Sequence, residues 1–294
     1  MVEYSFLSQI KNNEILVADG ATGTNLIARG LPGGVTAESW VLDQPQNIIQ
    51  LHKDFINAGA NIILTSTFNA SSIRLKGSIL EGKAVYINRI AVELAKTAVG
   101  EAKVYIAGSM GPVGQLLKPF GPLDADDVKN AYTEQALALS EAGADLLVIE
   151  TQFDMGEINA AVQGLRLVSN LPLVVSLSYD RGKRTMMGIS PSQAGKELEG
   201  LPVDILGINC GRSLDENLQN LIELRQITTK PIWFKPNAGL PHIDPLGKTS
   251  YDVTPKMMGS LVPSWRTNGA QIIGGCCGTS PDHLLEISRF VKMQ

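Results

Sequence analysis

The sequence predicts an α/β fold, a single-domain (β/α)8 TIM barrel that spans residues 1–294. Eight short segments are almost continuously apolar, which is typical of parallel strands that are covered on both faces. They recur at intervals of roughly 25 to 45 residues, and amphipathic helical patterns lie between several of them. A length of 294 residues with 44% hydrophobic residues suits one such barrel and its core.

Each expected strand is a short apolar run. In chain order these runs are Ile15–Asp19, Asn61–Ser66, Val104–Gly108, Asp145–Glu150, Leu173–Ser178, Ile205–Asn209, Ile232–Lys235 and Gln271–Gly274. Helical faces are predicted where apolar residues recur at helical spacing, at Ile48, Leu51, Phe55 and Ile56 and again at Leu214, Leu218, Leu221 and Ile222.

Three joints between a helix and a strand share one local pattern. Gly59, Gly143 and Gly269 each stand between two residues of an Ala-Gly-Ala or Asn-Gly-Ala segment, directly before an expected strand. A glycine there suits the left-handed conformation that ends many helices. A doubly wound sheet is the alternative fold, but it leaves some strand–helix units unplaced. Residues from Pro236 to about Pro255 contain four prolines, which predicts a substantial loop over the barrel mouth.

Charge and hydropathy narrow the class of protein. The net charge of −4 argues against a nucleic-acid partner, which would need clustered Lys and Arg. No apolar run approaches the roughly 20 residues that a membrane helix needs. The first 14 residues lack the apolar core of a signal peptide, so a cytoplasmic protein without a membrane partner is expected.

The chain has three cysteines, Cys210, Cys276 and Cys277. An odd number, with two of them adjacent, makes a disulfide framework improbable. All three follow expected strands, whose carboxyl ends meet at the rim where barrel active sites lie. Three converging thiolates predict a Zn²⁺ site, and three protein ligands leave the fourth position open, as in catalytic sites. The alternative is that they are three small buried hydrophobic residues.

Other polar residues end the expected strands and should reach the same rim. They are Asp19 and Gly20, Thr65 to Asn69, Glu150 and Thr151, Asn209, and Lys235 to Gly239. The glycines of Gly274–Gly278 have a second interpretation, because glycines after the eighth strand of a barrel often bind phosphate through backbone N–H groups. Beside cysteines, they more readily allow close approach of backbone and substrate. His52, His242 and His283 are weak candidates for metal ligands.

Four motifs resemble the homocysteine S-methyltransferase family, and in particular the homocysteine-binding domain of cobalamin-dependent methionine synthase. They are Asp19-Gly20-Ala21-Thr22-Gly23-Thr24, Gly207-Ile208-Asn209-Cys210, Pro236-Asn237-Ala238-Gly239-Leu240-Pro241 and Gly274-Gly275-Cys276-Cys277-Gly278-Thr279-Ser280-Pro281. The resemblance covers essentially the whole chain and implies the same barrel, with zinc held by Cys210, Cys276 and Cys277.

The resemblance also implies a substrate site for L-homocysteine. Asp19 and Glu150 would hold its ammonium group, backbone donors near Gly20 and Gly275 would hold its carboxylate, and Thr67 would be a further contact. The resemblance suggests Asn237 as the fourth zinc ligand when substrate is absent. Asn237 equally suits a role in shaping the turn that it begins.

The implied chemistry is a methyl transfer to sulfur that forms methionine. A free thiol has a pKa near ~8.5, so only a small fraction is ionised at pH 7, whereas binding to Zn²⁺ deprotonates it. Three cysteine thiolates already overcompensate the charge of the metal, so a fourth thiolate should be loosely held and nucleophilic.

The methyl donor is a separate question. The resemblance implies methylcobalamin, S-methylmethionine, S-adenosylmethionine or betaine, and S-methylmethionine users typically have Arg where this chain has Gly278. The sequence has no folate or cobalamin segment, so we expect methylcobalamin carried by a separate corrinoid protein. Two other classes stay open: a phosphate-binding barrel enzyme such as an isomerase, and a non-catalytic zinc- or thiol-binding subunit of a methyl-transfer complex.

Overall fold

Eight parallel strands form the centre of the molecule. The computed structural model describes residues 6–181, 183–243 and 249–293. The strands are β1 (Leu16–Val17), β2 (Ile62–Leu64), β3 (Tyr105–Met110), β4 (Leu146–Gln152), β5 (Leu173–Leu177), β6 (Ile205–Cys210), β7 (Ile232–Pro236) and β10 (Ala270–Ile273). Their order in the sheet is β1-β10-β7-β6-β5-β4-β3-β2. A parallel bridge between Ala18 and Ile62 joins the two ends of the sheet, so the barrel closes. The predicted (β/α)8 fold and all eight expected strands are confirmed.

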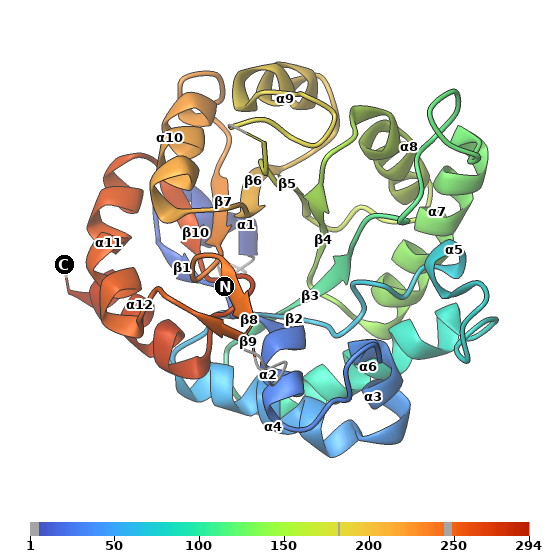
Figure 1. Ribbon diagram of the computed structural model, residues 1–294, viewed down its shortest axis with the longest axis horizontal. Coiled ribbons are helices and arrows are strands. Elements are labelled where there is room, and N and C mark those ends of the chain that lie inside the picture. Colours follow the sequence, from blue (N-terminus) through green and yellow to red (C-terminus); the bar gives the residue numbers. More distant parts are fainter. Residues whose placement is uncertain (1–5, 182, 244–248, 294) are drawn as a thin grey trace.

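Helices surround this barrel (Figure 1). In chain order they are α1 (Phe6–Lys11), α2 (Thr22–Ala28), α3 (Ala37–Asp43), α4 (Pro45–Asn57), α5 (Ser72–Leu75), α6 (Ala84–Val99), α7 (Ala125–Ala142), α8 (Met155–Arg166), α9 (Pro191–Glu199), α10 (Leu214–Arg225), α11 (Pro255–Thr267) and α12 (Pro281–Lys292). None of the helices in the described ranges is both long and apolar enough to cross a membrane.

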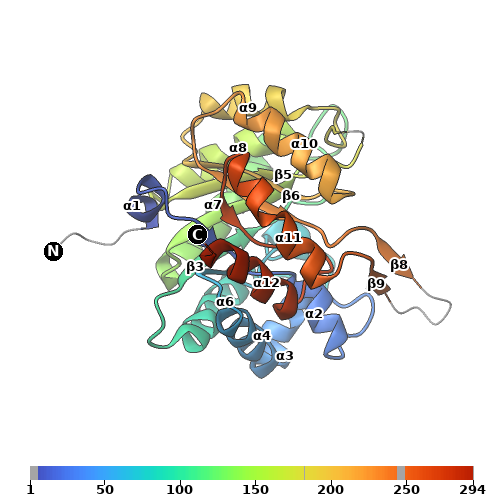
Figure 2. The same cartoon turned by 90° about the vertical axis from the view of Figure 1, so that its left-hand side faces the viewer.

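The apolar patterns of the sequence become two layers of core. In α4, Ile48, Leu51 and Phe55 are buried against the sheet, as their spacing predicts. The second layer fills the inside of the barrel, and Phe6 and Ile10 of α1 belong to it. Helix α1 therefore closes the end of the barrel opposite the pair β8 and β9 (Figure 2). Burying each of these two side chains stabilises the fold by roughly 1.5–3 kcal/mol.

Local signals also set the ends of elements. Gly59, Gly143 and Gly269 have φ of 104°, 95° and 96°, which confirms the predicted left-handed joints. The segment from Pro236 to Pro255 differs from the expected irregular loop, because Pro241–Ile243 (β8) and Thr249–Tyr251 (β9) pair as a short antiparallel ribbon. In the ribbon the backbone N–H and C=O groups of the two strands bond to each other, whereas an irregular exposed loop would leave more of them to water. The centre of that segment, residues 244–248, lies outside the described residues.

A buried polar network supports the rim beside β3 and β4. The Glu157 Oε1 atom accepts hydrogen bonds from the Val113 N–H at 2.7 Å and from the Tyr132 hydroxyl at 2.8 Å. The Gln152 amide donates to the same hydroxyl at 2.9 Å. Burial raises the pKa of Glu157 to about 7, although these hydrogen bonds oppose the shift.

This raised pKa predicts a pH-dependent contribution to stability. A carboxyl group that binds its proton more tightly in the folded state stabilises that state at pH below about 4.5, and the contribution is lost as the pH rises through about 7. In Glu157→Gln the amide oxygen can still accept both hydrogen bonds. We expect the loss of unfolding free energy between pH 5 and pH 8 to be smaller than in the wild type by about 2 kcal/mol.

Chemical denaturation at several pH values measures this difference. Glu141→Gln is the control, because Glu141 is half exposed in a surface pair with Arg89 and should leave the pH dependence unchanged. Parallel pH profiles for Glu157→Gln and the wild type would contradict the prediction.

Candidate active site

Three cysteine sulfur atoms meet at the carboxyl ends of the strands. Cys210 ends β6, and Cys276 and Cys277 lie in the loop that follows β10. Their Sγ atoms all lie within 4.8 Å of one another, and Cys210 and Cys276 are 3.0 Å apart. A tetrahedral zinc with Zn–S bonds of about 2.3 Å needs sulfurs about 3.8 Å apart, so a small adjustment of the side chains suffices. Among the described residues this is the one group of three His, Cys, Asp or Glu side chains placed to hold a metal.

Strand β7 holds the two cysteine loops together. The Asn237 N–H donates to the Cys210 carbonyl at 3.2 Å, and the Ala238 N–H donates to the Cys277 carbonyl at 2.9 Å. The Cys276 N–H in turn donates to the Pro236 carbonyl at 2.9 Å. The two loops come from strands on either side of β7, so these backbone hydrogen bonds help to bring the three cysteines together.

The cluster favours ionised sulfur. Hydrogen bonds from the thiols of Cys210 and Cys276 lower the pKa of Cys277 to about 3. Hydrogen bonds of Cys210 with Cys276 and Cys277, together with burial, raise the pKa of Cys210 well above its ordinary value, because its thiol is the donor. One thiolate therefore forms readily, and a second or third needs a cation. This charge pattern suits a soft metal ion.

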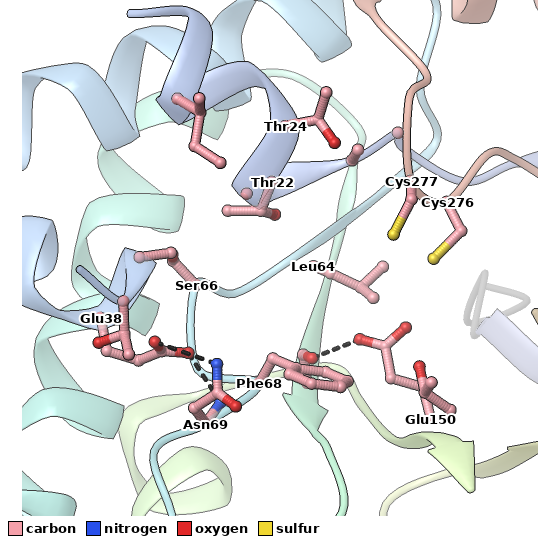
Figure 3. Close-up of a pocket in the computed structure, with 18 of the residues that line it drawn as sticks. Thr22, Thr24, Glu38, Leu64, Ser66, Phe68, Asn69, Glu150, Cys276 and Cys277 are labelled. Atoms are coloured by element: carbon pink, nitrogen blue, oxygen red, sulfur yellow. Dashed lines mark hydrogen bonds between the residues drawn. The ribbon is translucent and has the colours of Figure 1, made fainter. Parts of the chain in front are cut away.

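A cavity of about 420 Å³ opens beside the sulfurs. Figure 3 shows Cys276 and Cys277 on one side of it and Glu38 with Asn69 on another, with Phe68 and Glu150 on the wall between them. Its wall includes Gly20, Gly275 and all three cysteines. The volume is in the range typical of small-molecule sites.

Two buried acids, Glu38 and Glu150, line this cavity. Glu38 already accepts the Asn69 N–H at 2.7 Å, whereas Glu150 lies nearer the cysteines. Glu150 lies on β4 at an irregularity in the pairing with β5, between Ile149 and Gln152, where Thr151 has a φ of 60°. Such a bulge turns a side chain away from the regular alternation of the strand. The Ser109 hydroxyl donates to Oε1 of Glu150. Burial raises the pKa of Glu150 to about 7, while the nearby Lys235 ammonium opposes this shift.

Lys235 was expected at the rim from the sequence, but no role was predicted for it. Its ammonium group lines the cavity and donates to Oδ1 of Asp19 at 2.6 Å, and both side chains are almost fully buried. Burial alone would lower the pKa of Lys235, but the carboxylates of Asp19 and Glu150 outweigh it and raise the pKa. A lysine at the end of an otherwise apolar strand was the available signal. Its role as the partner of Asp19 becomes clear only from the structure.

The other predicted substrate contacts occupy different places. Asp19 is buried behind the wall, where Oδ2 accepts from the Leu64 N–H at 2.8 Å and Oδ1 from Lys235. Thr67 is fully buried, and its hydroxyl donates to the Ser109 carbonyl at 2.6 Å. Gly20 and Gly275 do line the cavity. Sequence position placed Asp19 and Thr67 at the rim, but it did not show that other protein groups engage their side chains.

Two features describe the side chain of Asn237. Its side-chain amide donates to the Gly211 carbonyl at 2.8 Å, which shapes the turn after β7. Its Oδ1 atom is buried and has no hydrogen-bond partner among the described residues. A buried oxygen without a partner is costly in free energy, and a metal ion nearby would satisfy it.

The loop after β10 is poorly suited to bind phosphate. The N–H groups of Gly274, Gly275 and Cys276 donate to the carbonyl oxygens of Phe234, Asp19 and Pro236 at 2.9 to 3.1 Å. The Gly278 N–H donates to the Thr24 hydroxyl at 3.2 Å. A phosphate cradle needs such donors to point outward. The glycines here instead allow close packing, since a Cβ on Gly274 would lie 2.7 Å from the carbonyl oxygens of Ala18 and Asp19.

The backbone conformation at Gly278 and the ring of Tyr251 leave no room for a side chain at this position. Its φ is 82°, and a Cβ at this position would lie 2.4 Å from the ring of Tyr251 in β9. An arginine at position 278 would therefore need both a strained backbone and a displaced Tyr251.

None of the three histidines joins the cysteines. His283 lies in the first turn of α12, where its ring pairs with Ser280 and with the Val253 carbonyl. His52 is buried in α4, and His242 is exposed near Asp252.

A closed parallel barrel with three sulfurs and a buried acid in one rim cavity defines a class, barrel proteins with a soft-metal site that takes a small polar substrate. Comparison with known proteins identifies the family within this class. The model of the family "Homocysteine S-methyltransferase" matches residues 16–291. The chain belongs to the homocysteine S-methyltransferase family.

Individual relatives agree with this assignment. The chain is 29% identical to methionine synthase of Mycobacterium tuberculosis and of Mycobacterium leprae, over 97% and 94% of its own length. It spans about a quarter of the length of these two relatives. Among solved structures, the metallated form of the homocysteine methyltransferase MmuM from Escherichia coli matches with a TM-score of 0.81 and 26% identity. That match covers 96% of this chain and 98% of the other.

Proposed function

We propose that this chain transfers a methyl group to the thiol of L-homocysteine and forms methionine, with Zn²⁺ held by Cys210, Cys276 and Cys277. The observation that carries the proposal is the meeting of three sulfurs and the buried Glu150 in one cavity. Family membership supports the substrate class. When bound, zinc would keep the substrate thiol ionised at neutral pH and would hold it in place.

The side chains of the cavity would bind the amino-acid part of the substrate. Ser109 occupies Oε1 of Glu150 and thereby orients the carboxylate toward an ammonium group. Lys235 neutralises Asp19 and the Asn69 N–H binds Glu38, so Glu150 is the acid left for the substrate. An ammonium group beside Glu150 would lower its pKa again and keep it ionised. Gly20 and Gly275 would offer room for the substrate carboxylate. Thr67 would act indirectly, through the Ser109 carbonyl that it binds.

Asn237 and the substrate thiol would alternate as the fourth zinc ligand. Its buried, unpartnered Oδ1 supports a role as fourth ligand when no thiol is bound. Its bond to Gly211 would keep the amide close by when a thiol takes that place.

The proposed donor is methylcobalamin, carried by a corrinoid protein separate from this barrel. Gly278 supports this choice, because the ring of Tyr251 fills the space in which S-methylmethionine users are expected to have arginine. S-Methylmethionine, S-adenosylmethionine and betaine are the alternative donors.

A turnover assay with zinc-loaded protein tests this proposal. Methionine formation from homocysteine is expected with methylcobalamin and not with S-methylmethionine, S-adenosylmethionine or betaine. Turnover with one of the latter three alone would replace the donor and leave the proposed acceptor intact. Binding of homocysteine without turnover with any donor would favour the alternative of a non-catalytic subunit.

Replacing Glu150 tests the substrate contact. Glu150→Gln retains the acceptor for Ser109 but removes the charge, and a hydrogen bond to a charged group is worth roughly 1.5–3 kcal/mol. We expect the Kd for homocysteine, measured by isothermal titration on zinc-loaded protein, to rise about 10- to 100-fold. The control is Glu157→Gln, another buried glutamate that does not line the cavity. Equal Kd values for the Glu150 variant and the wild type would exclude this contact.

A further inference from the structure

Asn209 lies at the centre of the cysteine site without lining the cavity. It is the residue before Cys210 on β6 and is fully buried. Its Oδ1 atom accepts the Thr151 N–H at 2.9 Å and the Ser176 hydroxyl at 2.6 Å. A backbone N–H can only donate, so the contact with Thr151 identifies the oxygen of the amide. The nitrogen of the Asn209 side chain must therefore face the opposite way, toward the cysteines.

The Nδ2 atom of Asn209 makes three contacts there. It donates to the Thr151 hydroxyl at 2.7 Å. It also lies 3.6 Å from the sulfur of Cys210 and 3.8 Å from the sulfur of Cys276. An amide nitrogen carries two hydrogens, so one goes to the hydroxyl and the other is left for the two sulfurs. Asn209 is thus a single N–H donor shared between two of the three sulfurs.

The backbone at this point explains why the donor is so well fixed. Thr151 and Cys210 have φ of 60° and 58°, a left-handed conformation that costs residues with a side chain roughly 1–3 kcal/mol each. The Asn209 side chain hydrogen-bonds to both the backbone N–H and the hydroxyl of Thr151. Asn209 also directly precedes Cys210 in the chain. Strands β4, β5 and β6 are thereby joined at their carboxyl ends by one side chain. Strain of this kind persists only where the surroundings determine the geometry.

We infer that Asn209 is a positioning residue that sets the place and the charge of the Cys210 and Cys276 sulfurs. A donated N–H draws electron density from a thiolate and makes that sulfur a weaker nucleophile. Cys210 and Cys276 then compete less with the substrate thiol for the methyl group. This inference rests on the proposed function, because it concerns the thiolates of that zinc site.

Metal binding and spectroscopy test the inference without a turnover assay. Co²⁺ replaces zinc in such sites and gives sulfur-to-metal charge-transfer absorption that reports the charge on the sulfurs. In Asn209→Ala we expect these bands to move to lower energy, because the sulfurs become more electron-rich. We also expect zinc affinity, measured by competition with a chelator, to fall about 10- to 100-fold.

Ser176→Ala is the matched control. It removes a buried hydrogen bond from the same Asn209 side chain, but on the oxygen side, so it should leave the bands and the zinc affinity unchanged. Asn209→Asp keeps the shape and both acceptor contacts but lacks the N–H, and it serves if the alanine variant does not fold. It should shift the bands in the same direction as alanine.

The outcomes separate the inference from the proposed function. Wild-type bands and affinity in both Asn209 variants would overturn the role of Asn209 and leave the zinc site standing. The same shift in Ser176→Ala would show a general loosening of the site and would also overturn it. A wild-type protein that takes up neither metal would overturn the proposed zinc site, and the inference with it.

Discussion

Cys210→Ser is expected to abolish zinc binding and methyl transfer together. The serine hydroxyl is a hard, neutral oxygen that does not ionise near pH 7, so it replaces a soft anionic ligand with a poor one. Loss of a group that only supports a ligand already costs 10- to 100-fold in affinity, so loss of the ligand itself should cost more than about 100-fold. Metal analysis of the purified variant, with chelator competition, measures the effect.

The control for this experiment lies in the same loop. Ser213 caps α10 by accepting the Glu216 N–H at 3.1 Å and does not line the cavity. Ser213→Ala should lose about 1 kcal/mol of stability and keep one zinc per chain. A Cys210→Ser protein that retains one zinc with wild-type affinity would show that the three cysteines do not act as a metal site.

Lys235→Met should give the largest loss of stability in the barrel interior. It leaves the Asp19 carboxylate buried without its cation, and the acid Glu150 close by. Removing one partner of a buried ion pair typically costs 3–5 kcal/mol. We expect the unfolding free energy at pH 7 to fall by roughly that amount. Urea denaturation, monitored by circular dichroism, measures it.

Two further variants show whether the cost comes from the unpaired charge. In Asp19→Asn combined with Lys235→Met no charge of the pair remains, so most of the stability should return. Lys118→Met removes an exposed pair with Asp124 and should cost no more than about 1 kcal/mol. If the double variant is as unstable as Lys235→Met, lost packing rather than charge is the cause.

The architecture was readable from sequence because its signals are local. A buried parallel strand is an apolar run, and the joints at Gly59, Gly143 and Gly269 need a left-handed residue whatever the rest of the chain does. The three cysteines were readable for the same reason. Each follows a strand directly, and every strand of a closed parallel barrel ends at the same rim.

The hydrogen-bond and ion-pair partners of the polar side chains could not be predicted from local sequence patterns. Asp19 ends a strand as predicted, yet Lys235 reaches it from 216 residues away in the sequence. Thr67 is near the rim but turned toward Ser109, and Asn209 faces the sulfurs because Thr151 takes up its oxygen. Such pairings depend on which strands are neighbours and on their register, and these are properties of the closed barrel.

The sequence by itself determined the barrel, the three cysteines that meet at its rim and the resemblance to the homocysteine S-methyltransferases. Only the tertiary structure decided how charge is distributed around those cysteines. It pairs Asp19 with Lys235, leaves Glu150 facing the cavity and directs the Asn209 N–H at two sulfurs. The physical reason is the distance along the sequence over which each kind of interaction acts. Strand and joint preferences act over a few residues, whereas a buried charge or amide is satisfied only by groups that the closed barrel brings together.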